Sequence, residues 1–267
     1  MPKPHFTFAH NMGYTINVKS IESGENGMMK TKNSYKIMGR ELRLTSAEQM
    51  SDAYITALLL TVSGGFQDAY TYCFRGQVFA NAQTGNIVLL SANLLYGQWA
   101  RVLHYLIPLT AFVLGTCAAE LIRMRFKEAK KLHWRQTVLL LEILTLFIVG
   151  FIPSDNLANA MVSFVSAIQV QSFRKMHGKS YASTMCIGNL RSGTELVCSY
   201  FRTHEKKLLE SALRYGGVLL CFALGAGLGS VSAVNFGAKA IFISCGILTL
   251  AFLLLFLTPT VASDTHE

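Results

Sequence analysis

Six long apolar stretches, separated by short polar or basic segments, constrain the fold of this 267-residue chain more than any other feature. They lie at about 53–74, 102–122, 136–153, 156–174, 212–234 and 238–258. An α-helix rises about 1.5 Å per residue, so about 20 apolar residues cross the ~30 Å hydrocarbon core of a bilayer. Only 15% of the residues are charged, whereas soluble domains contain about 25%. The sequence therefore predicts an all-α polytopic membrane helix bundle with about six transmembrane helices.

Two shorter elements, at 77–97 and 178–201, interrupt this series. Each begins with polar residues and continues with helical character. In the first element the apolar part is confined to Ile87–Leu95, which spans only about half of the hydrocarbon core. We therefore predict two half-inserted polar helices beside the six full spans.

The order of segments recurs in the two halves of the chain, which is typical of an internal repeat. An offset of 102 residues, with one later insertion, aligns Gln67 with Gln169, Gly85 with Gly188, and Asn86 with Asn189. Repeat one is expected at about 51–153 and repeat two at about 154–258, within a membrane domain at 51–260.

Positive charges cluster between the apolar stretches, as in cytoplasmic loops of membrane proteins. The clusters are Arg123, Arg125, Lys127, Lys130, Lys131 and Arg135, and then Arg202, Lys206, Lys207 and Arg214. Because the basic tail and the first cluster both belong inside, one of the three segments between them should not cross, and 77–97 is the best candidate. The two halves then become inverted repeats, an architecture found in transporters, with both termini in the cytoplasm. The alternative is that 77–97 crosses fully and the charge rule fails once.

The first 50 residues are polar and basic and contain no apolar core of the kind found in signal peptides. We expect them to form a flexible cytoplasmic tail, with a second short tail at 261–267. Met28, Met29 and Met38 are alternative starts, so residues 1–37 could be absent from the native protein.

The two Gly-Asn pairs suggest how a solute could be bound. Thr84 or Asn86 is expected to cap a half-helix, whose unpaired N–H groups attract anions, and Gly188-Asn189 would do the same in the second half. Arg191 and Glu195 are four residues apart and can pair on one helical face. The functional interpretation is two half-helix ends facing one another at a substrate site; the alternative is two ordinary helices with a surface ion pair.

Ionisable residues inside apolar spans call for a partner or a polar cavity. Asp68 and Arg75 lie about two helical turns apart, which predicts an ion pair or a polar cavity at the outer end of the span; the alternative is two solvated groups near the interface. Glu142 lies alone within an apolar run and is a candidate proton relay, or else a neutral group hydrogen-bonded in the bundle.

The candidate substrate-binding residues are Asp68, Arg75, Asn81, Thr84, Gly85, Asn86, Gln169, Gly188, Asn189, Arg191 and Glu195. No hydrolase, zinc-protease or phosphate-loop motif occurs, so we expect neither an enzyme nor a cofactor or metal site. The net charge of +9 is not arranged as a nucleic-acid-binding stripe, and the bilayer is the expected partner. The small-residue run Gly225–Gly229 is expected to pack against another helix. The six cysteines are expected to be reduced thiols.

Two runs resemble the motifs of one known family. Gly65–Ala69 followed by Phe79–Asn86, and Met185–Glu195 in the second half, are similar to the signatures of the YoaK-like proteins (domain of unknown function 1275). Ile187 stands where that family usually has threonine. The resemblance covers about residues 50–260 and implies a bacterial inner-membrane protein of about six spans with no settled activity.

Two hypotheses follow for function. The first is a small transporter or permease-like protein for a polar or anionic solute, motivated by the inverted repeat with polar half-helices. The second is a non-transporting membrane protein that acts in partner binding or assembly and uses its polar motifs for packing.

Overall fold

The computed structural model describes residues 35–37, 40–42, 54–125, 131–176, 179–181, 183, 184 and 186–255. The predicted tails at 1–50 and 261–267 lie outside these residues, except for one antiparallel strand pair. This pair consists of β1 (Tyr35–Ile37) and β2 (Arg40–Leu42).

The membrane domain is helical, as predicted. Its helices are α1 (Tyr54–Phe74), α2 (Gln83–Leu95), α3 (Trp99–Arg125), α4 (Lys131–Val149), α5 (Asp155–Ser172), α6 (Cys186–Thr203), α7 (Lys206–Phe236) and α8 (Ile241–Leu254). A 3-10 turn, η2 (Gly237–Ala240), joins the last two helices, and the short strands β3 (Lys175–Met176) and β4 (Lys179–Ser180) form a hairpin before α6. The two polar elements begin as helices later than expected, at Gln83 and Cys186, because turns precede α2, and the β3–β4 hairpin and a turn precede α6.

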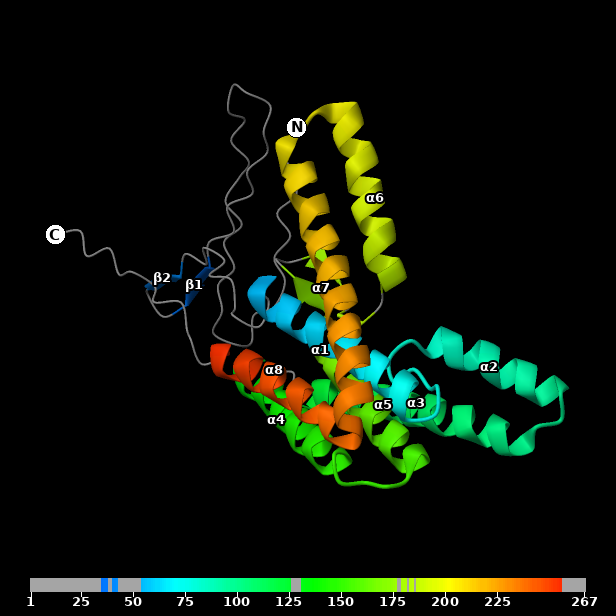
Figure 1. Ribbon diagram of the computed structural model, residues 1–267. Coiled ribbons are helices and arrows are strands. Elements are labelled where there is room, and N and C mark those ends of the chain that lie inside the picture. Colours follow the sequence, from blue (N-terminus) through cyan, green and yellow to red (C-terminus); the bar gives the residue numbers. More distant parts are fainter. Residues whose placement is uncertain are drawn as a thin grey trace, which may run out of the picture. The chain divides into compact units, whose positions relative to one another are not determined.

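Contacts between helices recur in the two halves of the membrane domain. Helix α1 packs against α7 and α8, and α5 packs correspondingly against α3 and α4. Helix α2 lies against α3 as a hairpin, and α6 lies against α7 in the same way (Figure 1). Helix α4 packs against α8, its own counterpart. Exchanging the first four helices with the last four therefore reproduces the main packing pairs.

One close glycine contact occurs in both halves, and its partner residues align with one another. A side chain on Gly225 of α7 would collide with the Val62 carbonyl of α1, and one on Gly115 of α3 would collide with the Phe164 carbonyl of α5. The offset of 102 residues that aligns the repeats also aligns Val62 with Phe164. Gly225 thus lets two helix backbones approach closely, which confirms the packing role predicted for Gly225–Gly229.

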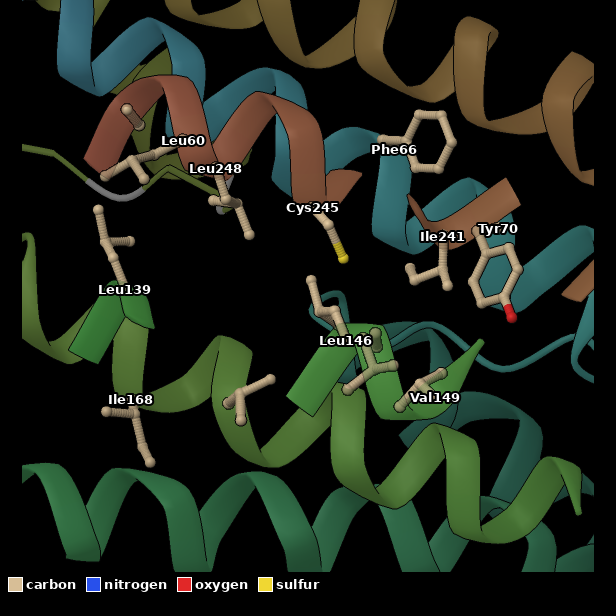
Figure 2. Close-up of a cluster of buried hydrophobic side chains, with 14 of the residues drawn as sticks. Leu60, Phe66, Tyr70, Leu139, Leu146, Val149, Ile168, Ile241, Cys245 and Leu248 are labelled. Carbon is tan, nitrogen blue, oxygen red and sulfur yellow. The ribbon is translucent and has the colours of Figure 1, made fainter. Parts of the chain in front are cut away.

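The apolar core lies between α1, α4, α5 and α8 (Figure 2). Helix α1 contributes Leu60 and Phe66, α4 contributes Leu139 and Leu146, and α8 contributes Leu248, all of them fully buried. This core places the middle of α1 beside the middle of α4, where the polar residues of the candidate site are found.

Many large apolar side chains on the outer helix faces are exposed, whereas the interior contains many polar ones. Leu114, Phe147 and Leu228 are each more than half exposed, while serines, glutamines and asparagines are buried. Soluble monomers rarely expose so much apolar surface, so this distribution is expected for helices that contact lipid. Within the described ranges, two helical stretches are long and apolar enough to cross a membrane: Trp99–Met124, with mean hydropathy 1.7, and Lys206–Leu254, which runs through α7, η2 and α8, with mean hydropathy 2.0.

All six cysteines are free, as predicted: Cys73, Cys117, Cys186, Cys198, Cys221 and Cys245.

Candidate functional site

A single carboxyl group lies at the centre of the buried polar interior. Glu142, near the middle of α4, is 1% exposed. Its Oε1 accepts hydrogen bonds from Gln67 Nε2 of α1 at 3.0 Å and from Gln169 Nε2 of α5 at 3.2 Å. Two amide groups from different helices therefore meet on one carboxyl oxygen.

Serine hydroxyls complete this centre. Ser166 donates to Gln67 Oε1 at 2.7 Å, and Gln67 Nε2 also reaches Ser244 Oγ of α8 at 3.3 Å. Ser63 and Ser244 share a hydrogen bond of 2.8 Å. We call this group the Glu142 cluster; it consists of Ser63, Gln67, Glu142, Ser166, Gln169 and Ser244.

Helical spacing and the repeat together explain how four helices build the Glu142 cluster. Ser63 and Gln67 are four residues apart on α1, and Ser166 and Gln169 are three apart on α5, so each pair shares a helix face. The 102-residue offset aligns Gln67 with Gln169. The two glutamines are therefore equivalent residues of the two halves, and they converge on one carboxyl group.

The hydrogen bonding of Glu142 is incomplete. Its Oε2 is buried and has no hydrogen-bond partner among the described residues. The residues bonded to its other oxygen are amides rather than cations. Burying a carboxylate without a countercharge is costly, so this position calls for a proton or another cation.

A second group surrounds Asp68, one residue after Gln67 on α1. Asp68 is 4% exposed, and its Oδ1 accepts a hydrogen bond from the backbone N–H of Asn81 at 2.7 Å. Asn81 Nδ2 donates to the carbonyl of Gly64, one helical turn earlier, at 3.3 Å. Thr184 also lies against Gly64: a Cβ atom added to Gly64 would be 2.5 Å from the methyl group of Thr184. The segments that precede α2 and α6 therefore both reach the same face of α1.

We call Asp68, Asn81 and Thr184 the Asp68 cluster. It is connected to the Glu142 cluster through Ser183, whose hydroxyl donates to Gln169 Oε1 at 3.3 Å. Ser183 precedes Thr184 directly in the chain. The two polar clusters are thus joined by the segment that leads into α6.

Two of the arrangements predicted for Asp68 and Arg75 are wrong: Arg75 pairs with Asp155 and not with Asp68, and both side chains are buried and not solvated. Arg75 is 2% exposed and bonds to Asp155 Oδ1 at 3.2 Å. Its other acceptors are Tyr70 Oη at 2.9 Å and the carbonyls of Ile152 at 2.8 Å and Val149 at 3.0 Å. The seven residues from Asp68 to Arg75 correspond to about 10 Å along the helix axis. The Arg75 side chain turns instead toward the α4–α5 connection, where the C-terminal carbonyls of α4 attract a cation.

The predicted capping role of Thr84 and Asn86 is also wrong. Helix α2 begins at Gln83, with Ala82 as its N-cap residue and no side-chain cap bond, so both residues fall inside the first turns. Thr84 is exposed. Asn86 is buried and binds back to the preceding turn, accepting from Phe79 N at 3.0 Å and donating to Phe79 O at 2.6 Å and Gln83 Oε1 at 2.9 Å. Asn86 thus holds the turn that leads into the helix.

The remaining predicted residues are spread over α2 and α6. Gly85 lies against the Phe79 ring, whereas Gly188 is exposed and a side chain there would point into open space. Asn189 is buried. The predicted Arg191–Glu195 pair is present at 2.8 Å, but both side chains are exposed, by 81% and 63%.

The structure therefore brings together Asp68, Asn81, Gln169 and Glu142, and it separates Arg75, Arg191 and Glu195 from them. The sequence reasoning missed other residues of the two clusters: Ser63, Gln67, Ser166, Ser183, Thr184 and Ser244. The signal that could have found Gln67 is the 102-residue offset itself, which pairs it with the candidate residue Gln169.

Comparison with known proteins agrees with the resemblance noted in the sequence. The family described as "Protein of unknown function (DUF1275)" matches residues 56–254. The UPF0700 transmembrane protein YoaK of Bacillus subtilis (strain 168) is 27% identical over 180 residues, which cover 63% of this chain and 78% of that protein. No solved structure matches the chain. Since the family match spans most of its length, this chain is a YoaK-like membrane protein that belongs to the DUF1275 family.

Proposed function

We propose that this protein is a small secondary transporter for a polar solute, built from two inverted repeats, in which Glu142 carries the coupling proton. The solute is neutral or cationic. The observation that carries the proposal is the convergence of Gln67 and Gln169, equivalent residues of the two halves, on the buried Glu142 carboxyl group.

The recurring helix contacts support a repeat, and the length of α2 supports its inversion. The apolar part of α2 is limited to Ile87–Leu95, about half of a membrane crossing at 1.5 Å per residue. If α2 and α6 enter the membrane only partway, each repeat contributes three crossings and the second repeat begins on the opposite side. The six spans are then α1, α3, α4, α5, α7 and α8.

A carboxyl group between two inverted repeats is well suited to proton coupling. In such transporters the substrate and coupling-ion sites lie near the midplane, where the repeats meet, and alternating access comes from one part rocking against the other. Gln67 and Gln169 belong to different repeats, so relative movement of the repeats changes the hydrogen bonds on Glu142. Such a change would alter how strongly the carboxyl group holds its proton on each side of the membrane.

The charge of the interior argues against the anionic solute expected from the half-helix ends. The two cations expected to bind an anion are engaged elsewhere, Arg75 with Asp155 and Arg191 with Glu195. The acidic groups Asp68 and Glu142 lie in the interior instead. Opposite charges attract strongly in a low-dielectric interior, which favours a cationic or neutral polar solute.

The test is proton-coupled flux in liposomes that contain the purified protein and a pH-sensitive dye. Pools of neutral and cationic metabolites are added outside, and we expect at least one pool to change the internal pH. Glu142→Gln should abolish this change because an amide cannot carry the proton. Glu210→Gln, which makes the same substitution at an exposed position of α7, should retain it. An undiminished pH change with Glu142→Gln would contradict the role of this residue.

The second candidate is a non-transporting protein that acts in partner binding or assembly. Its support is that Arg75 and Asn86, both within or next to the motif-bearing segments, direct their polar groups to the protein itself. A transporter must bind its solute, and a ligand at 100 times its dissociation constant stabilises the folded state by about 2.7 kcal/mol. Failure of every pool to raise the melting temperature or move protons would favour this second candidate.

A further inference from the structure

We infer that the Asp68 cluster is a binding site for a monovalent metal cation, with Na⁺ as the ion that fits its chemistry. The inference deepens the proposed function by naming a second coupling ion, and it rests on that function only for what binding achieves. The site lies where the segments preceding α2 and α6 meet on α1.

The first argument is the set of oxygens left without partners. Asp68 Oδ2, Asn81 Oδ1 and Thr184 Oγ1 are all buried and have no hydrogen-bond partner among the described residues. The three residues are at least 95% buried. A buried oxygen without a partner costs free energy. Asn81 bonds to both Asp68 and the Gly64 carbonyl, and the Thr184 methyl group lies against Gly64, so all three residues border the Gly64–Asp68 turn of α1. We infer that their three oxygens share one partner.

The second argument concerns what that partner can be. A proton on Asp68 could satisfy only one further acceptor, and the amide oxygen of Asn81 carries no proton of its own. A hard cation, in contrast, is held by several carboxylate, carbonyl and hydroxyl oxygens at once. The amide nitrogen of Asn81 already donates to the Gly64 carbonyl, which leaves its oxygen for the cation.

The third argument is charge balance. Asp68 is the carboxylate of this cluster, and its neutralisation requires one positive charge. Divalent ions in proteins are usually held by several carboxylates or by carboxylates together with substrate phosphates. One carboxylate with two neutral oxygens therefore favours Na⁺ over Ca²⁺ or Mg²⁺.

The consequence of binding follows from where the ligands come from. Asp68 and Asn81 belong to the first half of the chain and Thr184 to the second. A bound ion would hold the two halves together at this point. Because Ser183 bonds to Gln169, which bonds to Glu142, occupancy of the ion site would also be transmitted to the proton-carrying carboxyl group.

The test is the thermal stability of the purified full-length protein in NaCl, KCl or choline chloride at equal ionic strength. We expect Na⁺ to raise the melting temperature of the wild type in a saturable way and choline to have no such effect. Asp68→Asn should lower the Na⁺ affinity by at least about tenfold, equivalent to about 1.4 kcal/mol. Thr184→Val, which removes one oxygen at nearly constant volume, should lower it less, and Thr184→Ser should preserve it.

Radioactive ²²Na⁺ binding to the wild type gives a second measurement that depends on no variant. Bound ²²Na⁺ should be displaced by unlabelled Na⁺ and not by choline. Stabilisation that is equal in Na⁺ and choline, or that persists unchanged in Asp68→Asn, would overturn the inference. Stabilisation by K⁺ rather than Na⁺ would overturn the choice of ion.

Glu142→Gln separates this inference from the proposed function. It should lose proton-coupled flux and still bind Na⁺, because Glu142 is not a ligand of the ion. Proton-coupled flux without Na⁺ binding in the wild type would contradict the cation site and support the transporter. Na⁺ binding without flux under any condition would support the cation site and contradict the transporter.

Discussion

Two buried charged groups of this protein differ in how completely they are satisfied. Arg75 is bonded to four acceptors: a tyrosine hydroxyl, two carbonyls and the carboxylate of Asp155. Glu142 is equally buried, yet only one of its two oxygens accepts hydrogen bonds, and both come from neutral amides. Arg75, whose hydrogen bonds are complete, therefore fixes the end of α1. Glu142 still has one oxygen that can bind a proton or a cation.

The largest effect on stability is expected from replacing Arg75. Arg75→Met should lower the free energy of unfolding by about 3 kcal/mol, at the lower end of the range for broken buried ion pairs because Asp155 is partly exposed. The measurement is unfolding by SDS in mixed micelles. Arg191→Met, which breaks an exposed pair, is the matched control and should leave the unfolding midpoint unchanged. Equal losses in both variants would show that burial of Arg75 has no special importance.

The second largest effect on stability is expected at the crossing of α1 and α7, which depends on close packing and not on charge. Gly225→Val should cost about 1–3 kcal/mol, as expected for overpacking, because the new side chain collides with the Val62 carbonyl. Gly227→Val, two residues along the same helix, faces open space and should cost much less. Unfolding in mixed micelles again provides the comparison, and equal costs would argue against a close crossing at Gly225.

The smallest effect on stability is expected at Glu142. Glu142→Gln keeps a carbonyl oxygen for the two glutamine donors and removes an ionisable group, but its amide N–H donors replace Oε2, which has no partner among the described residues. The free energy of unfolding should therefore fall by only about 1 kcal/mol, the lower end of the cost of an unsatisfied buried donor. The same variant is expected to abolish proton-coupled flux. A loss of stability as large as that of Arg75→Met would show that Glu142 fixes the structure as Arg75 does and would remove the contrast between the two groups.

The helices could be predicted from the sequence because their signal is local. The run that begins at residue 53 became α1 (Tyr54–Phe74), and the run 156–174 became α5 (Asp155–Ser172). The pattern of apolar residues and the breaks at polar or glycine-containing turns indicate such segments without knowledge of the rest of the fold. The helix cap was harder to predict. An N-cap residue directly precedes its helix, but α2 begins at Gln83, before both Thr84 and Asn86.

The candidate site could be predicted only in part. Ionisable groups inside apolar spans indicate Asp68 and Glu142, the repeat alignment indicates Gln169, and the family-like motif indicates Asn81; the structure places all four in the two clusters. Arg75 was assigned to the same site because helical spacing relates it to Asp68. That relation states the face and not the separation along the helix, which is about 10 Å for seven residues, and the Arg75 side chain bonds instead to carbonyls of the α4–α5 connection.

By itself, the sequence determined the membrane-spanning character and the helical segments, since each depends on residues near one another in the chain. Only the tertiary structure decided that Gln67 and Gln169 meet at Glu142 and that Arg75 bonds to Asp155. Helical periodicity indicates which residues share a face of a helix. Which other helix that face contacts depends on packing between segments far apart in the chain. In this protein that choice joins Gln67 to a carboxyl group 75 residues away.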